Sequence, residues 1–373
     1  MDRDVSIPLL LARAAGAQGV YAKSNKTVSL VLHGQTTGCA LPTCDDAQPL
    51  KGVVTVDKPA GITAIEVEIE GNIRLQEFGG LKRTTRILHE TIPLWSAGSG
   101  QPAPPREIPF SYRMPGAGEG EMRLPPSFEV SIAGGRKHGQ REANGFWSWI
   151  RYTLTIHVKG KDSATILNSH LKIPDQIEKL LDKEKSITVP ILFASRLRSP
   201  HATMPSITQL LNEPSHYTPL TFALRNASKN LEPLHAEVHL ARPATYCMRR
   251  PIPVCLRLQG TGISLDRFTV TLSVHRKSTQ RILQNADNED NWMESLDSIG
   301  EASMERVDGA STSYDAMWAG QVLVQPNIMA GSFSVEGLAV RDYLVLDIRP
   351  PSNKPGMLFV DNRVSVPILL TTD

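Results

Sequence analysis

Two short clusters of basic residues are the side chains in this sequence best suited to binding a ligand. Lys82, Arg83 and Arg86 follow a segment of alternating apolar and acidic residues, and the second cluster lies in a glycine-flanked stretch. The guanidinium group presents a fork of N–H donors that matches carboxylate and phosphate oxygens. The clusters therefore predict two candidate sites for acidic or phosphorylated ligands, although groups of this size also occur as solvated loops. The second cluster consists of Arg136, Lys137 and Arg141.

Histidines and cysteines with metal-ligand spacing are placed unfavourably for metal binding. His235 and His239 are four residues apart, but the apolar residues between and beside them alternate as in a strand, so both histidines are expected to point to solvent. Cys39 and Cys44 flank a turn-like segment and are expected to be a loop thiol pair. The sequence therefore predicts no metal site.

Catalytic signatures are absent from the sequence. It contains no GxSxG elbow, no GxxxxGK[ST] loop and no HExxH helix. The glycine-rich segment 116–120 lacks the preceding strand and following helix that would direct amide groups at a phosphate. We therefore expect neither an enzyme nor a cofactor.

Composition narrows the class of protein further. Forty Lys and Arg residues against 38 Asp and Glu residues give a net charge of +2, which does not favour a nucleic-acid partner. The four cysteines are too few for a disulfide scaffold in a chain of 373 residues. No stretch approaches the roughly 18 apolar residues that cross a bilayer. We expect a cytoplasmic protein without a transmembrane segment.

Apolar residues recur with a period of two along most of the chain. Residues 65–70 (IEVEIE) alternate without a fault, which puts three branched apolar side chains on one face of a strand and three carboxylates on the other. Strands with one dry face are typical of antiparallel sheets. The 27 prolines also disfavour long helices. The fold class is predicted to be all-β, built from sandwiches. The same alternation recurs around residues 28–32, 152–158, 236–240, 268–274 and 364–368.

Similar segments recur in the two halves of the chain. Residues 152–158 followed by 187–193 (YTLTIHV, ITVPILF) resemble residues 343–348 followed by 364–370 (YLVLDI, VSVPILL). Residues 53–69 and 252–272 likewise share the order of an apolar strand, a Gly-Ile bend and an alternating strand. This pattern predicts tandem copies of one sandwich. We place the first domain at residues 20–200, a linker at 201–217 and the second domain at 218–373.

Two segments depart from the strand pattern. Residues 175–185 have apolar side chains at helical spacing after Pro174 and predict a short surface helix. Residues 284–320 carry nine acidic residues and the single base Arg306, and this one-signed, weakly hydrophobic composition predicts a disordered insertion in the second domain.

Three motifs in the first half have the order found in one known family. They are residues 109–115 (PFSYRMP), 124–128 (LPPSF) and 149–154 (WIRYTL), with 91–95 (TIPLW) ahead of them. This series resembles the arrestin family, in particular the arrestin-related (alpha-type) proteins of fungi. The opening strands, residues 28–34, 50–56 and 62–71, are similar to those of an arrestin N-domain. The resemblance covers residues 20–200 closely and residues 220–373 more weakly.

The resemblance implies two tandem immunoglobulin-like β-sandwich domains and a non-enzymatic adaptor. Such a protein binds cytosolic tails or loops of membrane proteins in endocytosis, protein transport or signalling, in the cytoplasm or peripherally at the plasma membrane or endosome. It also makes acidic or phosphorylated tails the natural ligand of the basic clusters. The alternative is a structural trafficking-coat subunit, like the arrestin-like component of retromer, which would bind other coat proteins.

The motif at residues 124–128 also has an interpretation from its residues alone. Pro125 and Pro126 lack backbone donors and hold the chain extended, so the segment is predicted to be a connector anchored by Leu124 and Phe128, with Ser127 between them. An exposed proline-rich docking site is the other interpretation. No Pro-Pro-x-Tyr motif is present, so any ubiquitin ligase is expected to be recruited only through a partner.

Overall fold

The computed structural model describes most of the chain outside its first 17 residues and several internal segments. The described residues form strands and one short helix, α4 (Ile207–Asn212). The prediction of an all-β protein is confirmed. The described residues are 18–36, 38–98, 103–115, 123–132, 145–160, 186–195, 205–212, 219–224, 234–260, 265, 267–282, 292–307, 315–350 and 362–372.

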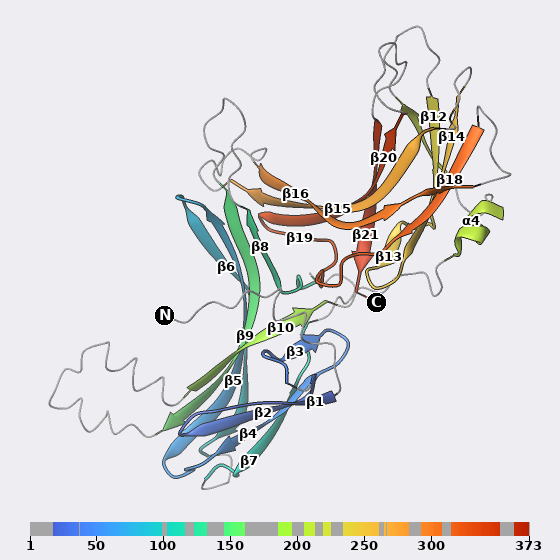
Figure 1. The fold of residues 1–373 in the computed structure, drawn as a ribbon. Coiled ribbons are helices and arrows are strands. Elements are labelled where there is room, and N and C mark those ends of the chain that lie inside the picture. The colour runs from blue at the N-terminus through green and yellow to red at the C-terminus, as the bar shows by residue number, and fades with distance from the viewer. Residues whose placement is uncertain are drawn as a thin grey trace. The chain divides into compact units, whose positions relative to one another are not determined.

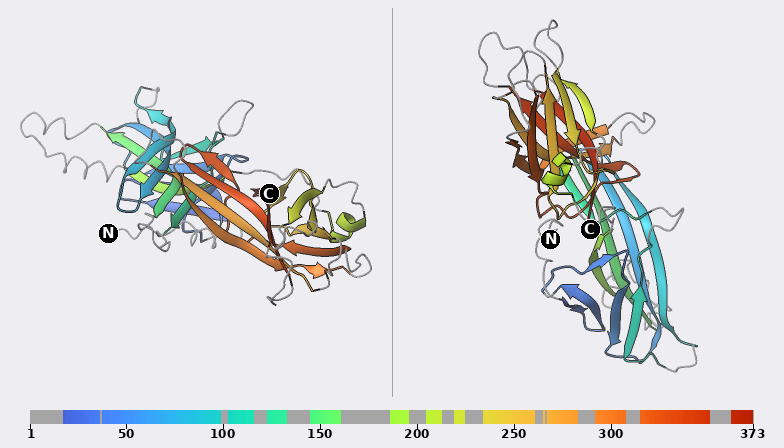
Figure 2. Two further views of the ribbon diagram at one scale, coloured as in Figure 1. Left: turned by 90° about the horizontal axis from the view of Figure 1, so that it is seen from above. Right: turned by 90° about the vertical axis from the view of Figure 1, so that its right-hand side faces the viewer.

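The described elements divide into two compact units (Figure 1). Strands β1 to β10 form the first unit, and α4 with strands β11 to β21 forms the second. Each unit contains two sheets, which can also be followed in the two further views of Figure 2.

The first unit consists of a four-stranded and a six-stranded sheet. The four-stranded sheet has the order β1 (Gln18–Ser24), β2 (Val28–Thr36), β4 (Leu50–Val56) and β7 (Glu107–Tyr112). The six-stranded sheet has the order β3 (Thr43–Asp45), β10 (Ser186–Ala194), β9 (Phe146–Gly160), β5 (Ile62–Glu77) and β6 (Lys82–Ser96), and β8 (Phe128–Ile132) also pairs with β9. Strands β3 and β10 are parallel, whereas the other pairs are antiparallel.

The alternation at residues 65–70 sets the faces of β5. Ile65, Val67 and Ile69 are fully buried, as the sequence predicts, and the glutamates between them lie on the opposite face of the sheet. Burying each of these side chains contributes about 1.5–3 kcal/mol relative to leaving it exposed. The same face of the sheet receives Leu154 and Ile156 from β9, which are also fully buried. The core of the first unit therefore follows directly from the period-two pattern.

The second unit consists of a five-stranded and a six-stranded sheet. The five-stranded sheet has the order β11 (Leu220–Leu224), β12 (Leu234–His239), β14 (Ile252–Gln259), β18 (Asp315–Val322) and β17 (Glu305–Arg306). The six-stranded sheet has the order β13 (Thr245–Cys247), β21 (Asn362–Thr371), β20 (Leu338–Arg349), β15 (Thr269–Arg281) and β16 (Trp292–Ser303), and β19 (Phe333–Val335) also pairs with β20.

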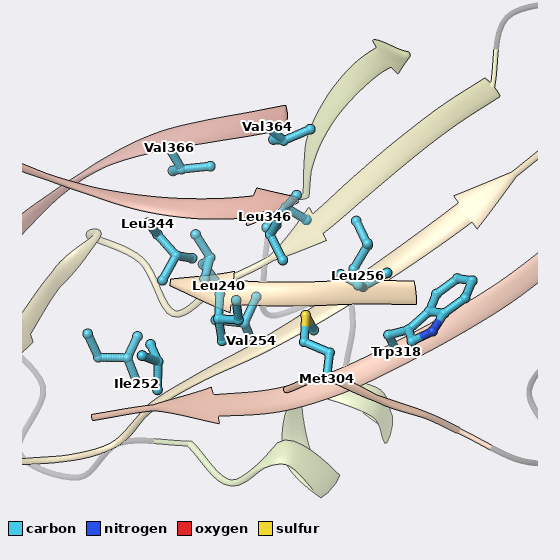
Figure 3. Close-up of a cluster of buried hydrophobic side chains, with 14 of the residues drawn as sticks. Leu240, Ile252, Val254, Leu256, Met304, Trp318, Leu344, Leu346, Val364 and Val366 are labelled. Carbon is cyan, nitrogen blue, oxygen red and sulfur yellow. The ribbon is translucent and has the colours of Figure 1, made fainter. Parts of the chain in front are cut away.

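The core of the second unit lies between its two sheets (Figure 3). Val254 and Leu256 of β14 and Trp318 of β18 belong to the same buried cluster as Leu344 and Leu346 of β20. Val364 and Val366 of β21 belong to the same cluster and are labelled in Figure 3. Two sheets that share one apolar core form a sandwich.

The two units have the same strand order. In the smaller sheet of each unit, the order β1-β2-β4-β7 of the first unit corresponds to β11-β12-β14-β18 of the second. In the six-stranded sheet, the order β3-β10-β9-β5-β6 corresponds to β13-β21-β20-β15-β16. The short parallel pairs correspond as well, β3 with β10 and β13 with β21. The similar sequence segments occupy matching strands, because residues 152–158 and 187–193 lie in β9 and β10, and residues 343–348 and 364–370 lie in β20 and β21.

Residues 284–320 correct the prediction of a disordered insertion. Most of the segment that the structure describes is β16, β17 and β18, and Ala316 and Trp318 belong to the core. The acidic residues misled the prediction because those of β16 lie at exposed positions. The few core side chains of the segment, such as Ile299 and Trp318, are divided between β16 and β18. Residues 283–291 and 308–314 lie outside the described residues.

The predicted linker at residues 201–217 also contains structure. Its described part includes α4, and Leu210 of that helix is buried against Cys255 and Ala319 on the outer face of the five-stranded sheet. The helix therefore belongs to the second unit. The helix predicted at residues 175–185 lies outside the described residues.

Candidate functional site

The first basic cluster lies at the start of β6, the edge strand of the six-stranded sheet of the first unit. Lys82 pairs with Gln76, Arg83 with Leu75 and Arg86 with Asn72 of β5. Directly paired residues share a face of a sheet. Lys82 and Arg86 therefore lie on the outer face, whereas Arg83 lies on the face of Leu75, so the structure separates Arg83 from the other two.

The second predicted cluster, Arg136, Lys137 and Arg141, lies outside the described residues. Its contribution to a site stays a prediction.

Neighbouring strands add two arginines and two tryptophans to the outer face beside Lys82 and Arg86. Arg74 of β5 pairs with Thr84 of β6 on one side and with Trp149 of β9 on the other. Arg151 and Trp147 lie two residues from Trp149 on the same face of β9. We call Arg74, Lys82, Arg86, Trp147, Trp149 and Arg151 the basic–aromatic patch.

The guanidinium groups of Arg74 and Arg151 lie over the indole rings of the patch. The Arg74 Cζ atom lies 5.6 Å from the centre of the Trp147 ring, and the Arg151 Cζ atom lies 4.8 Å from that of Trp149. Arg151 is also 5.9 Å from the Trp147 ring. Cation–π contacts of this kind contribute roughly 0.5–1 kcal/mol at exposed sites. They hold the side chains of Arg74 and Arg151 along the sheet surface.

Two carboxylates offset part of the patch's charge. Glu129 of β8 accepts hydrogen bonds from Trp147 Nε1 at 3.2 Å and from Arg151 Nη2 at 3.4 Å. Glu70 of β5 accepts from Arg86 Nε at 2.9 Å. Arg74 instead donates to the neutral amide of Gln76, at 3.0 Å. The four cations of the patch thus face two carboxylates, and the patch is positive.

Two N–H donors of the patch are shielded from solvent without an acceptor. Within the described part of the chain, neither Arg74 Nε nor Trp149 Nε1 has a hydrogen-bond partner. An unmatched buried donor costs about 1–3 kcal/mol. An incoming carboxylate or phosphate that reached these donors would recover part of that cost.

On the other half of the outer face, the carboxylates of Glu66 and Glu68 have side-chain partners. Glu68 lies between two histidines, with Oε2 at 2.7 Å from His157 Nε2 and Oε1 at 3.3 Å from His89 Nδ1. Glu66 accepts from Lys159 Nζ at 2.6 Å. Among the described residues, no group of three or more His, Cys, Asp or Glu side chains is arranged to hold a metal ion. The anion-attracting region of this face is therefore the basic–aromatic patch.

The segment at residues 124–128 is packed into the first unit. Leu124, Pro125, Pro126, Ser127 and Phe128 are all buried. This burial agrees with the connector interpretation of the motif.

Hydrogen bonds fix this connector. Ser127 N donates to the Phe193 carbonyl at 2.8 Å, and Phe193 N donates back to Ser127 Oγ at 2.9 Å. Tyr152 Oη donates to the Pro125 carbonyl at 2.6 Å. Burial raises the pKa of the Tyr152 hydroxyl well above its usual range, so the group stays protonated as a donor.

The histidine and cysteine predictions need two corrections. Cys44 is buried in β3 and is not a loop thiol, although Cys39 is partly exposed and neither forms a disulfide. His235 is exposed as predicted, but His239 is buried. His239 pairs with Cys255, which packs under α4, and the period-two pattern could not show that a helix covers this outer face.

Sequence reasoning missed Arg74, Arg151, Trp147 and Trp149. Each lies on the outward positions of an alternating strand, and that spacing was available in the sequence. Their proximity to Lys82 depends on the strand order β6-β5-β9, which no local pattern encodes.

Comparisons with known proteins add no relative. No family model matches the chain, and no curated protein sequence matches it. Within the part of the chain that the structure describes, no helix has the length and apolar character needed to cross a membrane.

Proposed function

We propose that this chain is a non-enzymatic, arrestin-like adaptor made of two immunoglobulin-like β-sandwich domains. The observation that carries the proposal is the strand order that the two units share apart from the additional β17, including the short parallel strand at one edge of each six-stranded sheet. The buried connector at residues 124–128 supports it, because the motif of the resemblance has a structural place in the first unit.

The proposed ligand is an acidic or phosphorylated segment from the cytosolic part of a membrane protein. The basic–aromatic patch supports this choice because it combines guanidinium forks with two indole rings on one sheet face. Carboxylates or phosphates would bind the cations, and the rings would contact the apolar parts of the segment.

A binding titration with the full chain tests this site. The probes are a peptide carrying phosphoserine and acidic residues and the same peptide with neutral residues in their place. Binding of the charged peptide should weaken as salt rises, because exposed charges are screened beyond about 8 Å at physiological ionic strength. The variant Lys82→Glu/Arg86→Glu should lower the affinity at least tenfold.

The matched control for that titration is Lys51→Glu/Lys58→Glu, which reverses two exposed lysines outside the patch. It should leave the affinity within about twofold, since the total charge changes equally but the site does not. Equal losses in the two variants would mean that the peptide senses only net charge, and the patch would not be the site.

The cellular role is tested by proximity labelling in the native cell. An adaptor should label membrane cargo together with ubiquitin-ligase components, the latter through a partner because no Pro-Pro-x-Tyr motif is present. Labelling of coat proteins without cargo would instead support the coat-subunit alternative.

A further inference from the structure

The edge strands β6 and β16 hold equivalent places in the two units. Each ends the six-stranded sheet of its unit, and within the described residues β6 is laddered only to β5, and β16 only to β15. An edge strand presents unpaired N–H and C=O groups that can pair with another strand. Among the described residues, neither strand has a second strand paired along its outer side.

A bulge in each strand separates a regular outer segment from the rest. In β6 the pairing passes from Arg86 to Leu88, so Ile87 is the bulged residue. In β16 it passes from Ser298 to Gly300, so Ile299 is bulged, and its carbonyl accepts a bond from Gln325 N. The regular segments beyond the bulges are residues 82–86 and 292–298. We call them the basic edge and the acidic edge.

The charges of these two edges are opposite and unmixed. The basic edge carries Lys82, Arg83 and Arg86 and no acidic residue, and the acidic edge carries Glu294 and Asp297 and no basic residue. Like charges placed on facing strands repel, whereas opposite charges stabilise the pairing. Two basic edges or two acidic edges would therefore oppose each other, and only a basic edge with an acidic edge is complementary.

Exposed apolar side chains lie at the same places. On the acidic edge, Leu296 is 54% and Trp292 is 42% exposed. Next to the basic edge, Leu81 is 53% and Phe78 is 38% exposed. Large apolar side chains on an open strand edge are a feature of surfaces that become covered on association.

We propose that the basic edge of one chain pairs with the acidic edge of a second copy of this chain. The pairing would extend the six-stranded sheet of the first unit with β16 of the neighbour. Because the two surfaces differ, the contact is heterologous and adds copies head to tail, into a ring or an open chain. The proposal does not rest on the ligand of the basic–aromatic patch, although Lys82 and Arg86 belong to both surfaces.

Sedimentation of the full chain over a range of concentrations tests the pairing. The protein should associate as its concentration rises, and less so at high salt. Variant A, Lys82→Glu/Arg83→Glu, has two acidic edges, and variant B, Glu294→Lys/Asp297→Lys, has two basic edges. Each alone should remain monomeric, and an equimolar mixture of A and B should associate again.

Two controls separate this result from loss of fold and from a general effect of charge. Thermal melts of A and B should match that of the unchanged protein. Glu107→Lys, on the edge strand β7 of the other sheet, should leave the association intact. Backbone amides of residues 82–86 and 292–298 should exchange hydrogen more slowly in the associated form.

Three results would overturn the proposal. They are a protein that stays monomeric at every concentration, an association that survives both reversals, and a mixture of A and B that remains monomeric. A monomer with protected edges would place the pairing within one chain, and this too contradicts contact with a second copy.

Discussion

Arg276 and Asp342 form a buried ion pair in the second unit at the positions that Gly71 and Tyr152 occupy in the first. Arg276 faces Asp342 across β15 and β20, and Gly71 faces Tyr152 across the matching strands β5 and β9. Arg276 Nε donates to Asp342 Oδ1 at 2.8 Å, and both side chains are shielded from solvent. At this place in the sheet, the second unit therefore has an ion pair, and the first unit has a glycine with a tyrosine ring.

In each unit, one of these side chains donates to a backbone carbonyl at an equivalent place in the chain. Tyr152 Oη donates to Pro125, three residues before β8 begins at Phe128, and Arg276 Nη2 donates at 2.7 Å to Ala330, three residues before β19 begins at Phe333. In each unit the contact attaches the segment before the short strand to the sheet. Both units therefore share a hydrogen bond from a side chain of the sheet to a carbonyl of the segment before the short strand.

Gly71→Ala should destabilise the first unit, because the tyrosine ring lies where a side chain would start. A Cβ at Gly71 would come within 2.6 Å of Tyr152 Cε1 and 3.0 Å of Leu88 Cβ. Overpacking of this kind typically costs about 1–3 kcal/mol. Urea denaturation measures the loss. Gly160→Ala is the control, since its new Cβ would meet only the Gly61 carbonyl at 3.3 Å. Equal stability of the two variants would contradict the packing argument.

Replacing Arg276 alone should destabilise the second unit more than replacing the whole ion pair by the glycine and tyrosine found in the first unit. Arg276→Gly leaves the Asp342 carboxylate buried and bonded only to neutral groups such as Ser332 Oγ, and breaking a buried ion pair on one side costs about 3–5 kcal/mol. The double variant Arg276→Gly/Asp342→Tyr removes the charge and supplies a phenol for the Ala330 carbonyl. It should recover at least about 1 kcal/mol in denaturation experiments. A double variant no more stable than Arg276→Gly would show that the two sites are not interchangeable.

Acidification should destabilise the second unit through His239. Burial lowers the pKa of His239 below its usual 6.5, Glu237 opposes this shift, and Arg257 adds to it. Below pH 6.5 the unfolded chain binds a proton that the folded chain does not, so stability is present above that pH and falls as the pH drops toward the folded pKa. Urea denaturation at about pH 7.5 and about pH 5.5 should show this loss.

The variant His239→Leu should lose less stability over the same pH interval. Some pH dependence should remain, because burial also lowers the pKa of His275, with Arg363 adding to the shift. His235→Leu, at an exposed position of the same strand, is the control and should behave like the unchanged protein. An undiminished pH dependence in His239→Leu would show that this ring is not the group responsible.

The period-two pattern predicted faces of strands but not relationships between them. It placed Ile65 and Val67 in the core because burial follows local alternation. It could not place Arg74 beside Trp149, or Gly71 under Tyr152, because these contacts depend on strand order and register. In β16 the side chains are mostly exposed and the charged ones are all acidic. This composition resembles that of a disordered segment, so the prediction missed the strand. The burial of His239 was likewise missed, because the pattern could not show that α4 packs on the outer face beside its ladder partner Cys255.

The burial of the connector at residues 124–128 bears on whether this segment could recruit a ubiquitin ligase directly. A WW domain binds an exposed Pro-Pro-x-Tyr segment, with the prolines in an aromatic groove and the tyrosine in a neighbouring pocket. Here the only proline pair followed by a ring two residues later ends at Phe128, which lacks the hydroxyl and is buried. The carbonyl of Pro125 is already bound by Tyr152. Releasing this segment would expose Leu124 and Phe128 and break those bonds.

We therefore expect the purified full chain not to bind isolated WW domains in a calorimetric titration. A Pro-Pro-x-Tyr peptide serves as the positive control for the WW domain. Because Phe128→Ala removes a packed ring and by itself destabilises the first unit, Pro105→Ala, at an exposed proline outside the connector, is the matched variant. Low-micromolar binding that is retained in Pro105→Ala and lost in a folded Phe128→Ala protein would identify the connector as a docking site and contradict its structural role. Absence of binding leaves recruitment of a ligase to a partner protein, whose proline motif would then be found among the neighbours labelled in the cell.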